Sequence, residues 1–286
     1  TLGLETLAKK VRELYPIERV AADIEAVYIQ ARAKRLWPKH LPILMYHKVP
    51  DQPLNSKHKI FVNKKQFSEQ MNWLKAKNFT TMTFADYQEF RTGRRSPKEF
   101  PKKPIILTFD DGYLDNLTNV APILTQNKQK AVIYLLADHT IDHNKWDVDQ
   151  GDIRSEIMSL ADKRKIAKLN FEIGSHGFSH RDLRTLSDHE VLQEMQDSKK
   201  RLEKDLSLQP ILSFAYPYGY LDERLKQLAK EAGYTFAVAT DNGGLHLEDD
   251  LFEIFRVNIF PSDNMKKFRR KISPLYRRWF RLSRKR

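Results

Sequence analysis

Two adjacent aspartates at the end of an apolar run are the residues of this chain with the clearest chemical potential. Asp110 and Asp111 follow the apolar residues 105–109, and His176 and His180 follow a second apolar stretch, about sixty-five residues later. One carboxylate and two imidazoles can hold a divalent ion and leave a coordination position open for water. Neighbouring carboxylates repel each other unless a cation lies close by. We therefore expect His176, His180 and one of the two aspartates to bind a metal ion and the other aspartate to act as a base.

The position of these residues at the ends of apolar runs supports the same interpretation. Taken alone, Asp-Asp-Gly is a common turn sequence, and two histidines four residues apart can lie on a surface helix. Short continuous apolar runs, however, are typical of buried parallel strands. Polar groups at the carboxyl ends of such strands meet at the functional face of an α/β barrel. Two further runs end in the same way, at Tyr46-His47 and at Tyr216-Pro217-Tyr218.

Strand and helix patterns alternate along the chain from residue 42 onward. Apolar runs predict strands at 42–47, 79–82, 105–109, 131–137, 171–173, 211–216, 236–240 and 254–259. Amphipathic spacing predicts helices at 67–78, 116–126, 152–168, 186–206 and 222–232, and Ser187 with Glu190 predicts a capping box. This alternation indicates an α/β fold with a parallel sheet. Residues 2–37 predict two further amphipathic helices, which would pack on the barrel or lie on a membrane.

At three of these sites the chain resembles a known family. Residues 108–112, 175–180 and 216–219 are similar, in this order, to three motifs of the polysaccharide deacetylases of the NodB-homology type, carbohydrate esterase family 4. The resemblance extends from about residue 41 to residue 260. It implies a distorted or incomplete (β/α)7 barrel. We accordingly divide the chain into N-terminal amphipathic helices (1–40), a deacetylase barrel (41–262) and a basic amphipathic helical tail (263–286).

The chain departs from the simplest family pattern at two positions. In that pattern the general-acid histidine lies near the carboxyl terminus, where this chain has only His246 after Asp241. Here His47 lies upstream of the two aspartates, which resembles the rearranged motif order of the poly-N-acetylglucosamine deacetylases. His47 is therefore our candidate acid. The arginine that commonly holds the catalytic aspartate would fall at Ala215. Arg256 could supply that charge from a neighbouring strand.

The resemblance implies metal-dependent hydrolysis of an N-acetyl group on an N-acetylhexosamine. Asp111, His176 and His180 would hold the ion, which we expect to be zinc, with nickel, cobalt or manganese as alternatives. Asp110 would take the proton of the attacking water, and His47 would protonate the leaving amine. A backbone N–H near Tyr218 would help to stabilise the oxyanion. Tyr216 and Tyr218 would line the acetyl pocket or serve as core aromatics, and Trp146 would stack on a sugar ring or anchor its loop.

The net charge of +13 lies mostly at the carboxyl terminus. Residues 266–286 contain eleven basic residues and no acidic one, whereas residues 1–40 carry +3 and residues 41–265 carry −1. Aromatic and arginine residues interleave in this tail, a pattern typical of a helix at an anionic membrane surface. Nucleic acid is the less favoured partner, and a solvated tail without a partner is the alternative. No obligate protein partner is indicated.

Composition limits the remaining possibilities. The 286 residues include no cysteine, which excludes disulfides and thiolate metal ligands. No apolar window has the length of a membrane span, and residues 1–40 lack a signal-peptide pattern. We expect a cytoplasmic protein that is peripheral at the inner membrane, or an exported or periplasmic one if the chain is a trimmed form.

The sequence also leads to an expectation about the glycan. The favoured substrate is a lipid-linked glycan such as the core of lipopolysaccharide or lipooligosaccharide, because the basic tail predicts an enzyme that faces a membrane. Poly-N-acetylglucosamine exopolysaccharide and O-acetylated carbohydrate are the alternatives. A non-catalytic glycan-binding protein on the same barrel is a further one, against which the complete set of Asp110, Asp111, His176 and His180 argues.

Overall fold

The computed structural model of the chain describes residues 40–240, 247 and 249–276. The predicted N-terminal helices up to residue 39, His246 and residues 277–286 of the predicted tail lie outside the described residues. The chain divides into two compact units, and in the smaller one the described residues are 86–101. That segment holds most of α4 (Phe84–Arg91) and the short 3-10 helix η1 (Pro97–Glu99). There Phe100 packs edge-on against Phe90, with ring centroids 5.0 Å apart.

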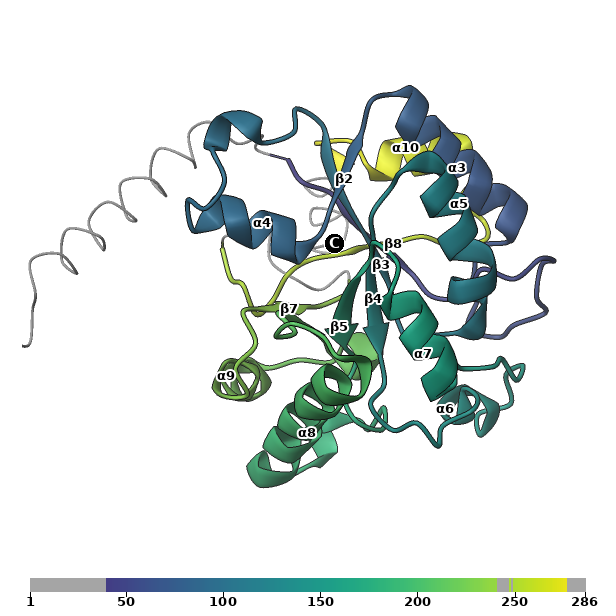
Figure 1. Cartoon of the computed structure of the whole chain (residues 1–286). Coiled ribbons are helices and arrows are strands. Elements are labelled where there is room, and N and C mark those ends of the chain that lie inside the picture. The colour runs from purple at the N-terminus through teal and green to yellow at the C-terminus, as the bar shows by residue number, and fades with distance from the viewer. Residues whose placement is uncertain (1–39, 241–246, 248, 277–286) are drawn as a thin grey trace, which may run out of the picture. The chain divides into compact units, whose positions relative to one another are not determined.

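The larger unit is built on a parallel sheet (Figure 1). Its strands are β1 (Ile43–Tyr46), β2 (Thr80–Met82), β3 (Pro104–Phe109), β4 (Val132–Leu135), β5 (Glu172–Ser175), β6 (Ser213–Ala215), β7 (Phe236–Val238) and β8 (Val257–Asn258). Their order is β7-β6-β5-β4-β3-β1-β8, and β2 pairs with the first half of β3. Every strand pair runs parallel. The carboxyl ends of the strands therefore point to one edge of the sheet.

Burial explains why these strands are continuous apolar runs. All six residues of β3 and all four of β1 and β4 are buried, as expected for a parallel sheet covered on both faces. β7 and β8 stand at the two ends of the strand order. The segment just before β8 nevertheless contacts β7, because Ile254 forms a parallel bridge with Val238. At the near edge the N–H of Ile259 donates to the carbonyl of Met45. The sheet thus curls into the distorted, incomplete barrel that the sequence predicts.

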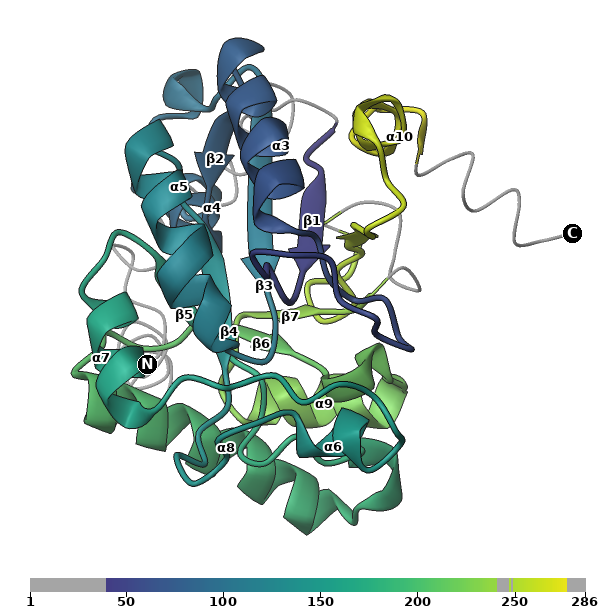
Figure 2. The same ribbon diagram turned by 90° about the vertical axis from the view of Figure 1, so that its right-hand side faces the viewer.

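Helices cover the outside of the curled sheet (Figures 1 and 2). They are α3 (Lys64–Ala76), η2 (Asn116–Val120, a π-helix) continuing into α5 (Ala121–Asn127), α7 (Leu160–Ala167), α8 (Asp188–Leu206), α9 (Glu223–Glu231) and α10 (Met265–Lys271). The short helix α6 (Lys145–Val148) lies in the loop after β4, beyond the carboxyl ends of the strands (Figure 1). Two 3-10 helices, η3 (Leu183–Thr185) and η4 (Pro217–Gly219), follow β5 and β6. The predicted capping box of α8 is present, since Ser187 and Glu190 bond reciprocally. Among the described residues, no helix combines the length and the hydrophobicity that a bilayer span requires.

Two segments differ from the expectations of the sequence. Residues 152–159 are not helical: Ser159 caps α7 by accepting the N–H of Asp162, so the helix starts only at Leu160. The preceding residues form antiparallel bridges from Ile157 to Tyr113 and from Glu156 to His143. The second segment lies within the predicted tail (263–286), where Phe268 and Ile272 are buried in the core of the barrel.

The packing of α10 explains this second difference. Phe268 and Ile272 are buried in the core, and Lys271 donates to the carbonyl of Asn258 and to the carboxylate of Asp263. The apolar face of α10 is thereby covered by the barrel, and only part of its positive charge faces solvent.

Candidate metal and catalytic site

The predicted site residues come together at the carboxyl edge of the sheet. His47 follows β1, Asp110 and Asp111 follow β3, His176 follows β5, and Tyr216 follows β6. β1, β3, β4, β5 and β6 are neighbours in the sheet, and their parallel direction places all these ends on one side. Residues far apart in sequence thus line a common cleft. In parallel α/β folds the functional residues generally gather at the carboxyl ends of the strands in this way.

The backbone is held in an unusual conformation at this edge. Asp111 and His180 both have positive φ angles, of 71° and 61°, which residues with a side chain rarely adopt. Gly112 has a φ of 73°, and a Cβ there would come within 2.8 Å of the Leu135 side chain. Only glycine therefore fits directly after the two aspartates. Such strain persists where the surrounding structure holds it, and it is common at functional sites.

Asp111, His176 and His180 form a buried cluster. The Nε2 atoms of His176 and His180 lie 3.0 and 3.4 Å from the same oxygen, Oδ1 of Asp111. The Nδ1 of His176 lies 2.8 Å from the carbonyl oxygen of Ala215. Because a carbonyl only accepts, Nδ1 must carry the proton, and in the neutral ring Nε2 presents its lone pair to Asp111. In this neutral form, an unprotonated nitrogen and a carboxylate oxygen face each other, as the ligands of a metal ion do.

This donor set fits a divalent metal ion. One donor atom from each of the three side chains lies within 4.8 Å of the others, and all three residues are buried. Among the described residues, Oδ1 of Asp111 has no hydrogen-bond partner although it is buried. An unpaired buried carboxylate oxygen is costly, and a cation between the three groups would offset that cost. One carboxylate and two imidazoles, with the second ring nitrogen of His176 bonded to a carbonyl, suit zinc or a similar ion.

Asp110 has a different partner, the buried guanidinium of Arg256. Two guanidinium nitrogens donate to its two carboxylate oxygens, over 2.6 and 2.7 Å. Arg256 also donates to the Thr108 hydroxyl and to the Ala239 carbonyl, and its side chain is fully buried. Burial alone would raise the pKa of Asp110, but the charge and hydrogen bonds of Arg256 outweigh it and hold that pKa below its usual range. Asp110 is therefore ionised, and Arg256 fixes the orientation of its carboxylate.

The imidazole of His47 lies on the other side of Asp110. Its Nε2 is 3.9 Å from Oδ2 of Asp110, and the ring lines the cleft. Burial lowers the pKa of His47, and the positive Arg256 lowers it further against the opposing effect of the two aspartates. A histidine whose protonated form is disfavoured in this way gives up a proton readily.

Two of the three aromatic residues predicted to bind substrate contact the His180 ring. Trp146 stacks on the His180 ring, with centroids 3.9 Å apart and an angle of 17° between planes. Tyr218 meets the same ring edge-on at 4.6 Å. Tyr216 is buried, and its hydroxyl donates to the Phe252 carbonyl. The imidazole of His180, a candidate metal ligand, therefore covers one face of the Trp146 ring. This stacking helps to orient the imidazole.

These groups line a cleft of about 670 Å³ that is open to solvent. Its floor includes the five polar site residues Asp110, Asp111, His176, His180 and His47. Most of the other lining residues are polar or aromatic, and the full set is Met45, His58, Ile60, Trp146, Asp147, Gln150, Asp182, Arg184, Tyr216, Tyr218, Gly219, Tyr220, Thr240 and Asn258. A volume of this size accommodates a ligand larger than a single small acyl group.

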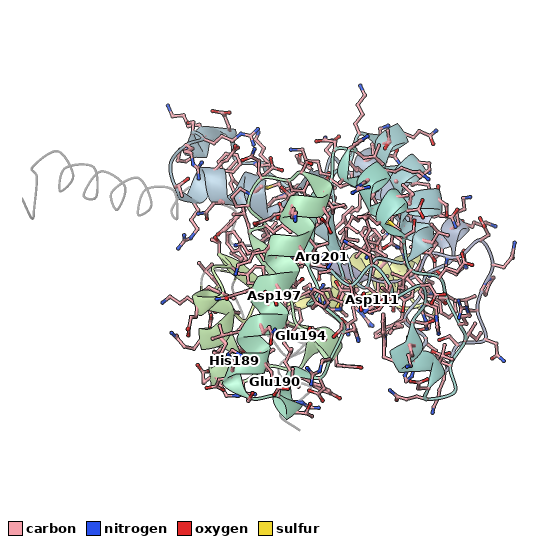
Figure 3. All side chains as sticks on the ribbon, turned by 60° about the horizontal axis from the view of Figure 1, so that its bottom comes forward. Asp111, His189, Glu190, Glu194, Asp197 and Arg201 are labelled. Carbon is pink, nitrogen blue, oxygen red and sulfur yellow. The ribbon has the colours of Figure 1, made fainter. Side chains whose placement is uncertain are left out.

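Sequence reasoning missed a buried carboxylate behind the histidine loop. Glu194 of α8 accepts from the N–H groups of Phe178 and Ser179, over 2.9 and 3.1 Å, and from the Ser179 hydroxyl over 2.7 Å. These bonds hold the turn that leads to His180. Figure 3 shows Glu194 on α8 together with Asp111 of the site. A sequence signal existed, because an acidic residue interrupts the apolar face that Val191, Met195 and Leu202 form on this helix.

The segment that carries His47 is also clamped by residues not singled out in the sequence. Asn116 donates to the His47 carbonyl over 2.8 Å, Asp115 accepts the N–H of Val49 over 2.8 Å, and Asn119 donates to the Val49 carbonyl over 2.9 Å. Asn116 and Asn119 belong to the π-helix η2, a conformation frequent at functional sites. Burial raises the pKa of Asp115 to about 7, although the Val49 N–H and nearby Lys48 act in the opposite direction.

The loop that carries Trp146 is held by a second polar cluster. Asp147 accepts from Asn144 over 3.0 Å and from the Tyr113 hydroxyl over 3.4 Å, and the buried Lys48 lies 3.5 Å away. Lys48 directly follows His47, and Tyr113 follows the Asp110-Asp111-Gly112 turn. The cluster therefore joins the loop after β4 to the ends of β1 and β3.

Comparisons with known proteins agree with this geometry. The sequence pattern of the polysaccharide deacetylase family matches residues 97–237. YxkH of Bacillus subtilis (strain 168), which bears the name of the same family, is 30% identical over 224 residues, covering 78% of this chain and 73% of the relative. The poly-β-1,6-N-acetyl-D-glucosamine N-deacetylase of Staphylococcus aureus is 22% identical over 204 residues, or 69% of this chain and 67% of that protein.

A solved structure shares the fold. The Streptococcus pyogenes deacetylase PplD, solved in complex with acetate, superposes with a TM-score of 0.67 at 24% identity. The superposition covers 83% of this chain and 100% of PplD. At this identity the likeness establishes the curled parallel barrel.

Proposed function

Because this chain belongs to the polysaccharide deacetylase family, we propose that it is a metal-dependent hydrolase that removes N-acetyl groups from N-acetylhexosamine residues of a bacterial surface glycan. The observation that carries the proposal is the pairing of two unlike groups at the floor of the cleft. Asp111, His176 and His180 form a buried donor set for a cation, and the ionised Asp110 lies beside it. Hydrolysis of an unactivated amide needs both a polarised carbonyl and a base for water.

Different residues of the chain would perform different steps of the reaction. A divalent ion held by Asp111, His176 and His180 would polarise the acetyl carbonyl and make water more acidic. Asp110, oriented by Arg256, would take one proton from the water that attacks the carbonyl carbon. His47 would supply a proton to the amine nitrogen as the C–N bond breaks. Acetate and a sugar amine are the products.

The turn after β6 suits the role of an oxyanion site. Pro217 has no N–H, and the N–H groups of Gly219 and Tyr220 donate to the carbonyls of Tyr216 and Pro217 within the turn. The N–H of Tyr218 is the remaining donor of this turn. We assign it the stabilisation of the developing negative charge, in agreement with the proximity of the Tyr218 ring to His180.

Two glycans are candidate substrates. The lipopolysaccharide or lipooligosaccharide core is the substrate that the basic tail led us to expect, as for an enzyme at a membrane surface. A polymer of β-1,6-linked N-acetylglucosamine is the second candidate, favoured by the activity named for the Staphylococcus aureus relative. Both present an N-acetylhexosamine whose acetyl group can enter the cleft.

Membrane association is part of the proposal. Lys266, Lys267, Arg269 and Arg270 of α10 are exposed, and they continue into the basic residues that follow. Cosedimentation with anionic vesicles that weakens as salt is raised would support this part. Equal recovery with neutral and anionic vesicles would contradict it.

Acetate release by the purified chain tests the proposal. The substrates are β-1,6-linked N-acetylglucosamine oligomers, lipopolysaccharide core oligosaccharide and O-acetylated xylan, each with added zinc and with a chelator. The Asp110→Asn protein should lose roughly 10²- to 10⁴-fold in turnover while it still binds zinc. Release at the parent rate in that variant, or in the presence of the chelator, would contradict the assignment. Preference for xylan would change the substrate class to O-acetyl esters.

A further inference from the structure

The two histidines of the candidate metal site are oriented by different means. The Nδ1 of His176 lies 2.8 Å from the Ala215 carbonyl oxygen, and this bond fixes the tautomer and the plane of that ring. The Nδ1 of His180 is buried, and it has no hydrogen-bond partner in residues 40–240, 247 and 249–276. A histidine that binds a metal ion usually donates its second ring N–H to an oxygen acceptor, which holds the imidazole toward the ion. His180 therefore depends on another kind of support.

Aromatic packing provides the support that His180 lacks. Trp146 lies nearly parallel to the imidazole, with ring centroids 3.9 Å apart and an angle of 17° between the planes. Tyr218 contacts the same ring edge-on, with centroids 4.6 Å apart. A flat ring at van der Waals distance prevents the imidazole from tilting toward that side, and the second ring limits its rotation. The two contacts thereby keep Nε2 of His180 directed at Oδ1 of Asp111, 3.4 Å away.

The segment that carries Trp146 is firmly anchored. Trp146 belongs to α6, and Asn144, the N-cap of this helix, is fully buried. The Asn144 side chain donates to the carboxylate of Asp147 over 3.0 Å and to the carbonyl of Ile153 over 3.1 Å. It also accepts the N–H of Ser155 over 2.6 Å. Because one buried side chain bonds to both ends of this segment, the indole is presented to His180 in a fixed position.

We propose that Trp146 is a positioning residue for the metal site. Its stacking holds the His180 imidazole in place of the hydrogen bond that His176 makes with Ala215. The inference rests on the proposed function, because it requires that Asp111, His176 and His180 bind a metal ion. It adds a residue outside the ligand set on which the affinity for that ion depends.

A positioning role and a sugar-stacking role of Trp146 lead to different losses. If the indole only stacked on a sugar ring, its removal would raise KM and leave the affinity for metal unchanged. If the indole holds His180, its removal lowers the affinity for metal in the absence of any glycan. Zinc binding without substrate therefore isolates the proposed role.

Three substitutions of Trp146 test the inference, with zinc affinity measured by competition with a chelating dye. Trp146→Ala should bind zinc about 10- to 100-fold more weakly than the parent, as when other residues that support metal ligands are removed. Trp146→Phe retains a flat ring and should stay within about threefold of the parent. Trp146→Leu fills the space with an apolar side chain that cannot stack, and it should lose about tenfold.

Trp73→Ala is the matched control. Trp73 is the other half-buried tryptophan of the described residues, and it packs on Phe79 and Phe268 with ring centroids 5.9 and 6.1 Å apart. This variant should unfold at a lower temperature and bind zinc as the parent does. Thermal unfolding of the metal-free variants identifies those that fold, and Trp146→Leu continues the test if Trp146→Ala does not fold. Parental zinc affinity in a folded Trp146→Ala or Trp146→Leu protein overturns the inference, as does an equal loss in Trp146→Phe or in Trp73→Ala.

Zinc affinity and acetate release separate this inference from the proposed function. A parent that binds zinc but releases no acetate from any N-acetylated glycan contradicts the proposed function, and the affinities of the variants still decide the role of Trp146. A parent that releases acetate, with a Trp146→Ala variant of equal zinc affinity, overturns only the inference. A parent that binds no divalent ion overturns the inference together with the metal dependence of the proposed reaction.

Discussion

Asp110 and Asp111 are neighbours in sequence and equally buried, yet their surroundings differ in kind. Each is 2% exposed. Both oxygens of Asp110 accept from the guanidinium of Arg256, whereas Oδ1 of Asp111 faces two imidazole nitrogens and has no hydrogen bond within the described part of the chain. Arg256 compensates the first charge, whereas the second faces the two imidazoles of the candidate metal site. Under the proposed function, this difference would let one dipeptide supply both a base and a metal ligand.

Removal of Arg256 should have the largest effect on stability. In Arg256→Met the carboxylate of Asp110 stays buried without its partner, which should cost about 3–5 kcal/mol of unfolding free energy. Urea denaturation of the metal-free protein measures this loss. The double variant Arg256→Met, Asp110→Asn should recover a large part of it, because the uncompensated charge is gone. A loss in the single variant below about 1 kcal/mol, the level of an exposed ion pair, would contradict the comparison.

Removal of His176 should act through the metal instead. At a zinc concentration about 100 times its dissociation constant, the parent should gain about 2.7 kcal/mol of stability. His176→Ala should lose that gain, and His176→Gln, which preserves more of the side-chain volume, should lose it too. His189→Ala serves as the control, because His189 is exposed on α8. Thermal unfolding with and without zinc measures the effect. Zinc stabilisation of His176→Ala equal to that of the parent would move the metal site elsewhere.

A smaller effect is expected from Glu194, which contacts the loop of a candidate ligand. Glu194→Gln removes the charge that accepts two backbone N–H groups and the Ser179 hydroxyl, so His180 should be held less firmly. We expect zinc affinity to fall about 10- to 100-fold, as for other residues that support metal ligands. Competition with a chelating dye measures it. Asp197→Asn makes the same chemical change on the same helix, and it should leave the affinity unchanged.

The result for Glu194 is informative only if the metal-free fold is intact. Metal-free Glu194→Gln and Asp197→Asn should therefore be compared by thermal unfolding first. An unfolding temperature close to that of the parent, together with lost zinc affinity, supports the positioning role. Unchanged zinc affinity in a folded Glu194→Gln protein would exclude it.

The smallest expected effect concerns a third aspartate, Asp115, which has no guanidinium and no candidate metal. Burial raises its pKa from the ordinary 3.8 to about 7. A raised folded-state pKa means that its contribution to stability is complete below about pH 3.8 and is lost as the pH rises through 7. Asp115→Asn retains an acceptor for the Val49 N–H and does not ionise. Its stability relative to the parent should therefore grow by about 1 kcal/mol from pH 5 to pH 8, because the carboxyl is partly exposed.

Denaturation midpoints of both proteins at the two pH values measure this difference. A difference between Asp115→Asn and the parent that does not change with pH would show that Asp115 has an ordinary pKa. The three aspartates would then differ less than their contacts indicate.

Much of the fold and of the candidate site followed from local sequence patterns. Apolar runs marked the strands, because parallel strands buried on both faces need continuous apolar side chains. The residues after each run were predicted to meet at one edge, and the structure brings Asp111, His176 and His180 within 4.8 Å. The capping box of Ser187 and Glu190 could also be predicted from the sequence, because its two hydrogen bonds join residues only three positions apart.

Other features depended on contacts between distant residues. Residues 152–159 carry a helical pattern, but their bridges to Tyr113 and His143 hold them in another conformation. The basic residues of α10 suggested a separate tail, although Phe268 and Ile272 are buried in the core. In both segments tertiary packing outweighed local preference.

The sequence by itself determined which residues could do chemistry, because carboxylates and imidazoles after apolar runs are visible without coordinates. The tertiary structure decided how the charges are divided among them. The bidentate pairing of Arg256 with Asp110 joins residues 146 positions apart, and the bonds from Glu194 to the His180 loop span two elements. Such contacts are specified by how strands curl and helices pack, and no spacing in the sequence encodes them directly. The family resemblance suggested Arg256 as the partner of Asp110, and the curl of the barrel provides the contact that pairs them.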